Sequence, residues 1–175
     1  LRAGWAAVGV LLLQVLLLAP TLDLPPAGRD SWRETDGLIV ARNFCREAAP
    51  LWRPRIDARG SGQGITGMEF PLLNWVGAKL SCAGLPLVPT GRALTFLSLL
   101  LATACVFLLA RRLWGDAGAA LAAGAFGFAP VSLYYGRTVQ PDLPALSLAL
   151  LAVLLFEWAL ESGRLSPRRA LLSAA

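Results

Sequence analysis

The sequence predicts an all-α integral membrane protein: a multi-span helical bundle with amphipathic juxtamembrane helices in its first outer loop. Hydrophobic residues make up 56% of the 175-residue chain, charged residues only 15%, and the mean hydropathy is +0.59. An ordinary soluble domain is less apolar than this. The apolar residues gather in uncharged runs, several of them close to the roughly 20 residues that a helix needs to cross a bilayer.

The expected spans follow these uncharged runs in order. They cover about 4–20, 92–110, 117–135 and 142–160, and another begins near 168. The first run also fits the apolar core of a secretory signal, and we favour a span because further apolar runs follow it. The third is rich in Ala and Gly, which lets helices pack closely, and Pro130 predicts a kink near its far end.

The arginines in the short connections predict the orientation. Positive charge gathers on the cytoplasmic side of short loops, and the basic residues that mark this side are Arg111, Arg112, Arg164, Arg168 and Arg169. The long segment 21–90 is then the outer loop. The bias toward Arg, Ala, Leu and Gly is typical of a GC-rich bacterial genome, so we expect a multi-pass protein of the bacterial inner membrane. Because the chain starts at Leu1 and stops as an apolar run begins, we expect a fragment truncated at both ends.

Two helices are expected within the outer loop. Ser31 and Glu34 have the spacing of a capping box and open a helical pattern. Its apolar face carries Leu38, Ala41, Cys45 and Ala48, and its polar face carries Asp36, Asn43 and Glu47. The second segment, 71–83, is apolar but too short to span. Both are expected to lie along the bilayer surface.

Composition excludes several function classes. The chain has no histidine, so the usual imidazole base and the commonest zinc ligand are missing from it. The basic residues are scattered between apolar runs, which argues against nucleic-acid binding. The three cysteines lack metal-binding spacing. Cys45 and Cys82 either pair in an oxidising compartment or are small buried hydrophobes like Cys105.

Three acids on the expected outer rim are the candidate site residues: Asp36 in the first surface helix, Glu69 before the second, and Asp142 at the start of the fourth span. Each also has a plain structural explanation, since a carboxylate is stabilised near the positive end of a helix. Arg137 is a candidate cation for an anionic group such as a phosphate, or an arginine that anchors the end of a span at the interface.

These residues fall in three motifs that carry a resemblance. The motifs are Arg33–Phe44, Gly67–Leu72, and Tyr134–Arg137 with Pro141–Asp142. In this order they resemble the N-terminal module of polyprenyl-phosphate-dependent membrane glycosyltransferases of the GT-C class, the superfamily of dolichyl-phosphate-mannose protein mannosyltransferases and aminoarabinose transferases. Residues 1–175 would then be the N-terminal part of a GT-C transmembrane module.

The resemblance implies a role for each acid. Asp36 matches the family's base or acceptor-positioning carboxylate, Asp142 matches another site carboxylate, and Glu69 matches an acid that binds substrate and, in some relatives, helps hold a metal. A divalent cation is the one cofactor that the resemblance allows. Some relatives have an acid and basic residues after these positions, where this chain has Gly37 and Phe70, which argues against an aminoarabinose substrate.

The expected function is therefore transfer of a sugar from a polyprenyl-phosphate donor to a glycan, lipid or protein acceptor on the outer, periplasmic face. A phosphate is already a good leaving group, so one carboxylate base is enough, and displacement from the opposite face inverts the anomeric centre. The expected partners are this lipid-linked donor, the acceptor and membrane lipid. The alternative is a non-catalytic multi-span protein, either a transporter subunit or a glycan-binding scaffold. A transporter is expected to carry ionisable groups at mid-membrane, and the central stretches of spans two to four carry none.

Overall fold

The computed structural model describes residues 2–28 and 31–162, and this part of the chain is helical without a named strand. Three of its helices are long and apolar enough to cross a membrane. They are α1 (Arg2–Leu18) together with the short 3-10 helix η1 (Ala19–Thr21) that continues it, α4 (Leu87–Gly127) and α6 (Asp142–Glu161). The predicted fold class, an all-α membrane bundle, is confirmed. The fifth expected span, from 168, lies outside the described residues.

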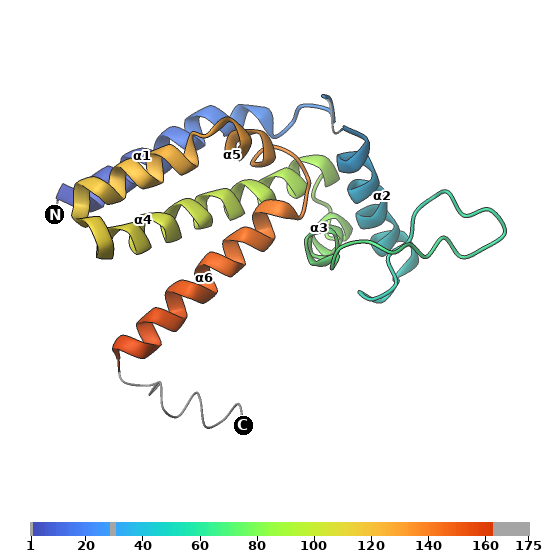
Figure 1. Ribbon diagram of the computed structural model, residues 1–175. Coiled ribbons are helices and arrows are strands. Elements are labelled where there is room, and N and C mark those ends of the chain that lie inside the picture. The colour runs from blue at the N-terminus through green and yellow to red at the C-terminus, as the bar shows by residue number, and fades with distance from the viewer. Residues whose placement is uncertain (1, 29–30, 163–175) are drawn as a thin grey trace, which may run out of the picture.

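Helix α4 is a helical hairpin rather than one straight rod (Figure 1). Gly115 has φ 66° and ψ −168°, a conformation open to glycine alone, and the helix folds back there. The two arms pack through the buried residues Phe107 and Ala110 on one side and Ala119 and Ala123 on the other. The ranges expected for the second and third spans therefore fall in two antiparallel arms.

A short break in the helix follows the second arm of α4. Helix α4 stops at Gly127, and the short helix α5 (Pro130–Tyr135) starts with Pro130 in its first turn. Proline suits a first helical turn because it has no N–H to leave unpaired there. The run expected as one span, 117–135, is thus built from two helical pieces.

Helix α1 is joined to α4 by buried polar contacts as well as apolar packing. Gln14 is fully buried, and its Nε2 donates to Thr103 Oγ1 and to the carbonyl oxygen of Gly127, both at 3.0 Å. Leu18 packs in a cluster with Leu99 of α4 and Leu143 of α6. The first apolar run is therefore packed as a helix of the bundle in the described structure.

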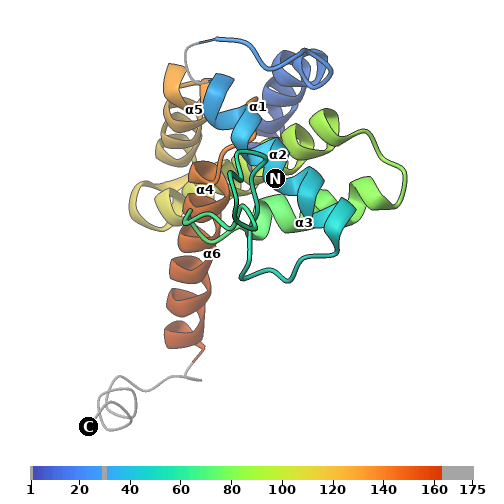
Figure 2. The same ribbon diagram turned by 90° about the vertical axis from the view of Figure 1, so that its right-hand side faces the viewer.

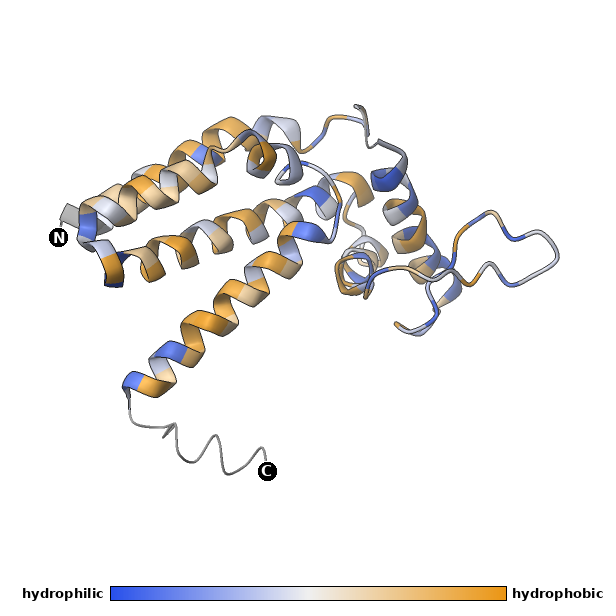
Figure 3. Ribbon diagram, in the orientation of Figure 1, coloured by the Kyte–Doolittle hydropathy of each residue, from blue (hydrophilic) through white to orange (hydrophobic). Residues whose placement is uncertain are grey.

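The outer surfaces of α1 and α6 are apolar (Figure 3). Only 11% of the candidate span in each helix is buried within the described structure. Broad apolar surfaces of this kind mark a protein that meets lipid or other helices rather than water. Charged residues lie instead at the helix ends, where Arg112 contacts Glu157 at 3.0 Å and Glu161 at 2.9 Å.

The other end of the bundle carries α2 (Ser31–Glu47) and α3 (Leu72–Cys82), which lie side by side near the starts of α4 and α6 (Figures 1 and 2). Their shared core contains Val40, Ala41 and Phe44 of α2 and Ala78 of α3. The expected apolar face of the first surface helix is correct at Leu38 and Ala41, which are buried. It is wrong at Ala48, because the helix ends at Glu47 and Ala48 is exposed with φ 49°.

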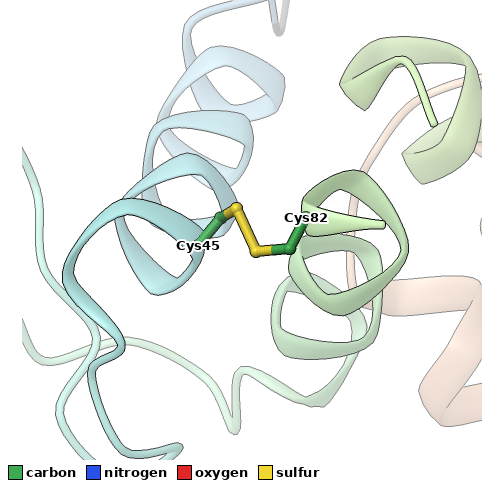
Figure 4. Close-up of a disulfide and its surroundings, with 2 residues drawn as sticks. All are labelled: Cys45 and Cys82. Carbon is green, nitrogen blue, oxygen red and sulfur yellow. A yellow bond between two sulfur atoms is a disulfide. The ribbon is translucent and has the colours of Figure 1, made fainter. Parts of the chain in front are cut away.

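Cys45 and Cys82 form a disulfide with a Cα–Cα distance of 5.6 Å (Figure 4). The bond joins the C-terminal turns of α2 and α3. Of the two alternatives that the sequence left open for these cysteines, the structure shows the paired one. Cys105 is a free and buried cysteine of α4.

Candidate functional site

The site begins with the first turn of α2, which a buried ion pair fixes to α4. The side chains of Glu34 and Arg92 are 1% and 5% exposed. Arg92 Nε donates to Glu34 Oε1 at 2.8 Å and Arg92 Nη2 to Glu34 Oε2 at 3.1 Å, a two-point contact. Glu34 therefore does not serve as the capping-box acid that its spacing predicted, since the carboxylate turns toward Arg92 instead.

The same pair holds two further segments of chain. Glu34 Oε1 accepts the backbone N–H of Val139 at 3.1 Å, which ties down the residues that lead into α6. Arg92 also donates to backbone carbonyl oxygens in the stretch after α1, namely those of Thr21, Leu24 and Pro25. A guanidinium has five donors in a rigid fork, which suits it to hold several acceptors at once. The ends of α1, α2, α4 and α6 meet at this pair.

A second contact aligns α2 with α3. Asn74 Nδ2 donates to the carbonyl oxygen of Gly37 at 2.8 Å. A Cβ on Gly37 would lie 3.1 Å from Asn74 Nδ2, closer than side chains ordinarily pack. A side chain at position 37 would therefore crowd Asn74, and glycine lets α2 and α3 approach closely here.

The anchored elements bring Arg33, Glu69 and Asp142 together. Arg33 Nη2 lies 2.6 Å from Glu69 Oε1 and 3.8 Å from Asp142 Oδ2. Their side chains are between one third and just over one half exposed. Arg33 comes from the first turn of α2, Glu69 from the segment before α3, and Asp142 from the first residue of α6.

The protonation of this cluster follows from its contacts. A hydrogen bond from the backbone of Glu69 itself, and then the Arg33 guanidinium, hold the pKa of the Glu69 carboxyl below its ordinary value. Burial favours a lower pKa for Arg33, but the hydrogen bond to Glu69 and the charges of Asp142 and Glu69 outweigh it and raise that pKa. At neutral pH the pair is therefore a carboxylate and a guanidinium.

Two cavities adjoin at this cluster. The larger, of about 500 Å³, is walled mainly by apolar side chains of α3, α4 and α6, including Leu73, Leu94 and Leu148, with Arg33, Glu69 and Asp142 at its polar end. The smaller, of about 300 Å³, is lined by Asp36, Asn74, Thr66 and neighbouring residues. The residues common to both cavities are Arg33, Glu69, Leu73 and Pro141.

Asp36 lines the smaller cavity one turn along α2 from Arg33. It is an exposed side chain, and no described residue donates a hydrogen bond to its carboxylate or pairs with it. All three acids singled out in the sequence thus border adjoining cavities at one end of the bundle. Glu69 and Asp142 share the larger one, and Glu69 and Asp36 share the smaller one.

Arg137 and Arg33 have different surroundings in the structure. Arg137 is exposed, and its guanidinium carbon lies 5.7 Å from the ring centre of Tyr134. The arginine beside the acids is Arg33, which the sequence analysis did not single out. Its spacing gives a signal in hindsight, because residues three apart on a helix share a face and Arg33 precedes Asp36 by three.

The cluster as it stands does not form a metal centre. Within residues 2–28 and 31–162, no group of three or more His, Cys, Asp or Glu side chains is placed to hold an ion. The Nη2 of Arg33 occupies the place beside Glu69 and neutralises its charge. Carboxylate oxygens are ligands that Mg²⁺ and Ca²⁺ prefer, but in the described cluster the partner of the Glu69 carboxylate is a guanidinium.

The protein has helices that can cross a membrane. At one end of the bundle, acids and an arginine lie beside an apolar cavity. These features define an integral membrane protein with a polar site that borders an apolar cavity. The chain belongs to the dolichyl-phosphate-mannose-protein mannosyltransferase family, whose model matches residues 83–174, more than half of the sequence. It is therefore a glycosyltransferase of the GT-C kind. No curated protein and no solved structure matches the chain.

The match covers part of the site. Asp142 and Arg137 lie within it, while Asp36, Glu69 and Arg33 precede it. The roles assigned to Asp36 and Glu69 therefore rest on the contacts and cavities described above and on the resemblance of their motifs.

Proposed function

We propose that this protein transfers a sugar from a polyprenyl-phosphate carrier to an acceptor hydroxyl on the outer face of the bacterial inner membrane. The observation that carries the proposal is the adjoining of the two cavities. An apolar cavity suits the first units of a polyprenyl chain, and a polar cavity beside it suits the sugar and the acceptor. A donor that is half lipid and half sugar needs both environments next to each other.

Asp36 is the proposed base. The acceptor oxygen attacks the anomeric carbon while the bond from that carbon to the phosphate oxygen breaks. The Asp36 carboxylate takes the proton of the acceptor hydroxyl, and polyprenyl phosphate leaves with the bonding electron pair. Because phosphate is a good leaving group, no acid has to protonate it. Attack opposite to the leaving group inverts the anomeric centre.

Glu69 and Asp142 have supporting roles in this proposal. Both carboxylates face the guanidinium of Arg33, and carboxylates at this position can accept hydrogen bonds from sugar hydroxyls. The disulfide between Cys45 and Cys82 supports the outer location of the site, because such bonds persist in oxidising compartments. The arginines at the opposite end, Arg111 and Arg112, agree with a cytoplasmic location there.

The test is transfer by the full-length protein reconstituted in membranes that contain its acceptors, with polyprenyl-phosphate mannose labelled in the sugar. We expect Asp36→Asn to lower the rate by about a hundredfold or more, since a positioned base contributes about 10²–10⁴. The matched control is Asp116→Asn, which removes an exposed carboxylate paired with Arg111 at the other end of the bundle. It is expected to keep full activity.

Two results would count against the proposal. One is a well-folded Asp36→Asn protein with undiminished transfer, which would remove the base. The other is saturable flux of a solute through proteoliposomes without any turnover of the labelled lipid, which would favour a transporter.

A further inference from the structure

Arg33 is the only cation among the described residues that line the two adjoining cavities. We propose that Arg33 binds the phosphate of the lipid-linked donor at the junction of these cavities, and that the Glu69 carboxylate holds this place until the phosphate displaces it. The inference deepens the proposed function and rests on it. It assigns to Arg33 a role that the sequence interpretation gave to Arg137.

The order of groups in the donor sets where the phosphate must lie. The phosphate connects the polyprenyl chain to the sugar. If the chain occupies the apolar cavity and the sugar reaches Asp36 in the polar one, the connecting group lies between them. The residues common to both cavities are Arg33, Glu69, Leu73 and Pro141. Arg33 is the member of this set that attracts a phosphate.

The Arg33 guanidinium has N–H donors that no described residue uses. Both of its contacts, to Glu69 and to Asp142, are made by Nη2. The N–H groups on Nη1 and Nε are not used by any described residue. A guanidinium presents its donors in a planar fork that matches two oxygens of a phosphate as well as those of a carboxylate. The side chain is 35% exposed, so a ligand can reach it.

The Glu69 carboxylate explains why the arginine is already in place. A guanidinium at the end of an apolar cavity is unfavourable without an anion beside it, and Glu69 supplies one at 2.6 Å. The phosphodiester of the donor is also an anion with two oxygens that a guanidinium fork can bind, so it competes with Glu69 for one cation. The nearby charge of Asp142 adds to the repulsion that an incoming phosphate meets. Removal of the Glu69 charge should therefore strengthen phosphate binding.

Arg137 provides a matched comparison. It is also an arginine near the outer rim, but its guanidinium lies against the ring of Tyr134, and neither cavity includes it among the described residues of its lining. If any outer arginine could hold the phosphate, Arg137→Ala and Arg33→Ala would have similar effects. If the phosphate is held only by an arginine at the junction of the cavities, only Arg33→Ala has a large effect.

The experiment measures binding, with no sugar transfer involved. The full-length protein in zwitterionic nanodiscs is titrated with a short-chain polyprenyl monophosphate and, separately, with the polyprenol of equal length. The ratio of the two affinities reports the contribution of the phosphate. We expect Arg33→Ala to lower this ratio about ten- to a hundredfold, the usual range for loss of a hydrogen bond to a charged group. Arg33→Lys should lower it less, and Arg137→Ala should leave it near that of the unmodified protein.

Glu69→Gln gives a result of opposite sign, a severalfold higher affinity for the monophosphate with the polyprenol affinity unchanged. A fall in phosphate affinity in this variant, or an unchanged ratio in a folded Arg33→Ala protein, overturns the inference. Loss of the ratio in Arg137→Ala alone also overturns it. The proposed function is separable, because it fails if Asp36→Asn keeps transfer activity even where the binding results are as expected.

Discussion

Replacement of Arg92 by Ala is expected to be among the most damaging single changes at the end of the bundle that carries α2 and α3. The variant leaves the Glu34 carboxylate, 1% exposed, without its cation. Removal of one partner of a buried ion pair costs about 3–5 kcal/mol, because the remaining charge stays desolvated. The backbone carbonyls of Thr21, Leu24 and Pro25 lose a donor as well, but water can reach this stretch, which limits their contribution.

The assay is thermal unfolding of the purified protein in detergent, followed by tryptophan fluorescence. On the scale of soluble domains of this size, about 2–4 °C per kcal/mol, the Tm is expected to fall on the order of 10 °C. Arg112→Ala is the matched control. Arg112 makes two ion pairs at the opposite end, but its partners Glu157 and Glu161 are exposed, and such pairs are worth about 1 kcal/mol or less.

The double variant Glu34→Leu with Arg92→Met separates charge from shape. It removes both charges and fills the same space with apolar groups, which is often neutral or stabilising for a buried pair. The N–H of Val139 loses its acceptor, a cost of about 1 kcal/mol. The double variant should therefore be more stable than Arg92→Ala. If Arg92→Ala melts like the control, or the double variant is no better than the single one, the reasoning from the buried charge is refuted.

Two further predictions concern the helices. Gly127→Ala should destabilise the protein by about 1–3 kcal/mol, because a Cβ there would lie 2.4 Å from Gln14 Nε2. The control Gly124→Ala has nothing within 4 Å of its Cβ and should be neutral or slightly stabilising. Equal Tm values for the two variants would contradict the close approach of α1 and α4. Loss of the disulfide in a Cys45→Ser and Cys82→Ser protein should cost about 4 kcal/mol for a loop of 37 residues. Unfolding with and without reductant measures this cost, and insensitivity of the unmodified protein to reductant would show that the bond does not form.

The fold was predictable from the sequence where it depends only on the length and charge of a continuous run of residues. A long uncharged apolar run that crosses a bilayer on its own forms a helix, because a helix pairs its backbone groups within the segment. The fold-back at Gly115 and the break before Pro130 have weaker signals in the sequence than the apolar runs have. The arginines at 111 and 112 marked the turn, but the chain turns a few residues later, at the glycine that can take a positive φ.

The candidate site was predictable in its acids and less so in their partners. Motif order and topology brought Asp36, Glu69 and Asp142 to one rim without any knowledge of side-chain directions. Pairing depends on those directions. Glu34 had the spacing of a capping acid, yet a buried arginine 58 residues away gives it a stronger contact. The sequence does not distinguish Arg33 from the other scattered arginines, because its contact with Glu69 depends on how α2 is rotated about its axis.

The position of the disulfide in the chain bears on how the site is made during synthesis. Both cysteines precede Leu87, where the hairpin α4 begins. In the proposed orientation, the segment with α2 and α3 can be exported and oxidised before the later helices leave the ribosome, since chains fold from the N-terminus as they are made. The disulfide would then link α2 and α3 early, whereas the Glu34–Arg92 pair that fixes the first turn of α2 would form only when α4 inserts, and Asp142 would complete the cluster with α6.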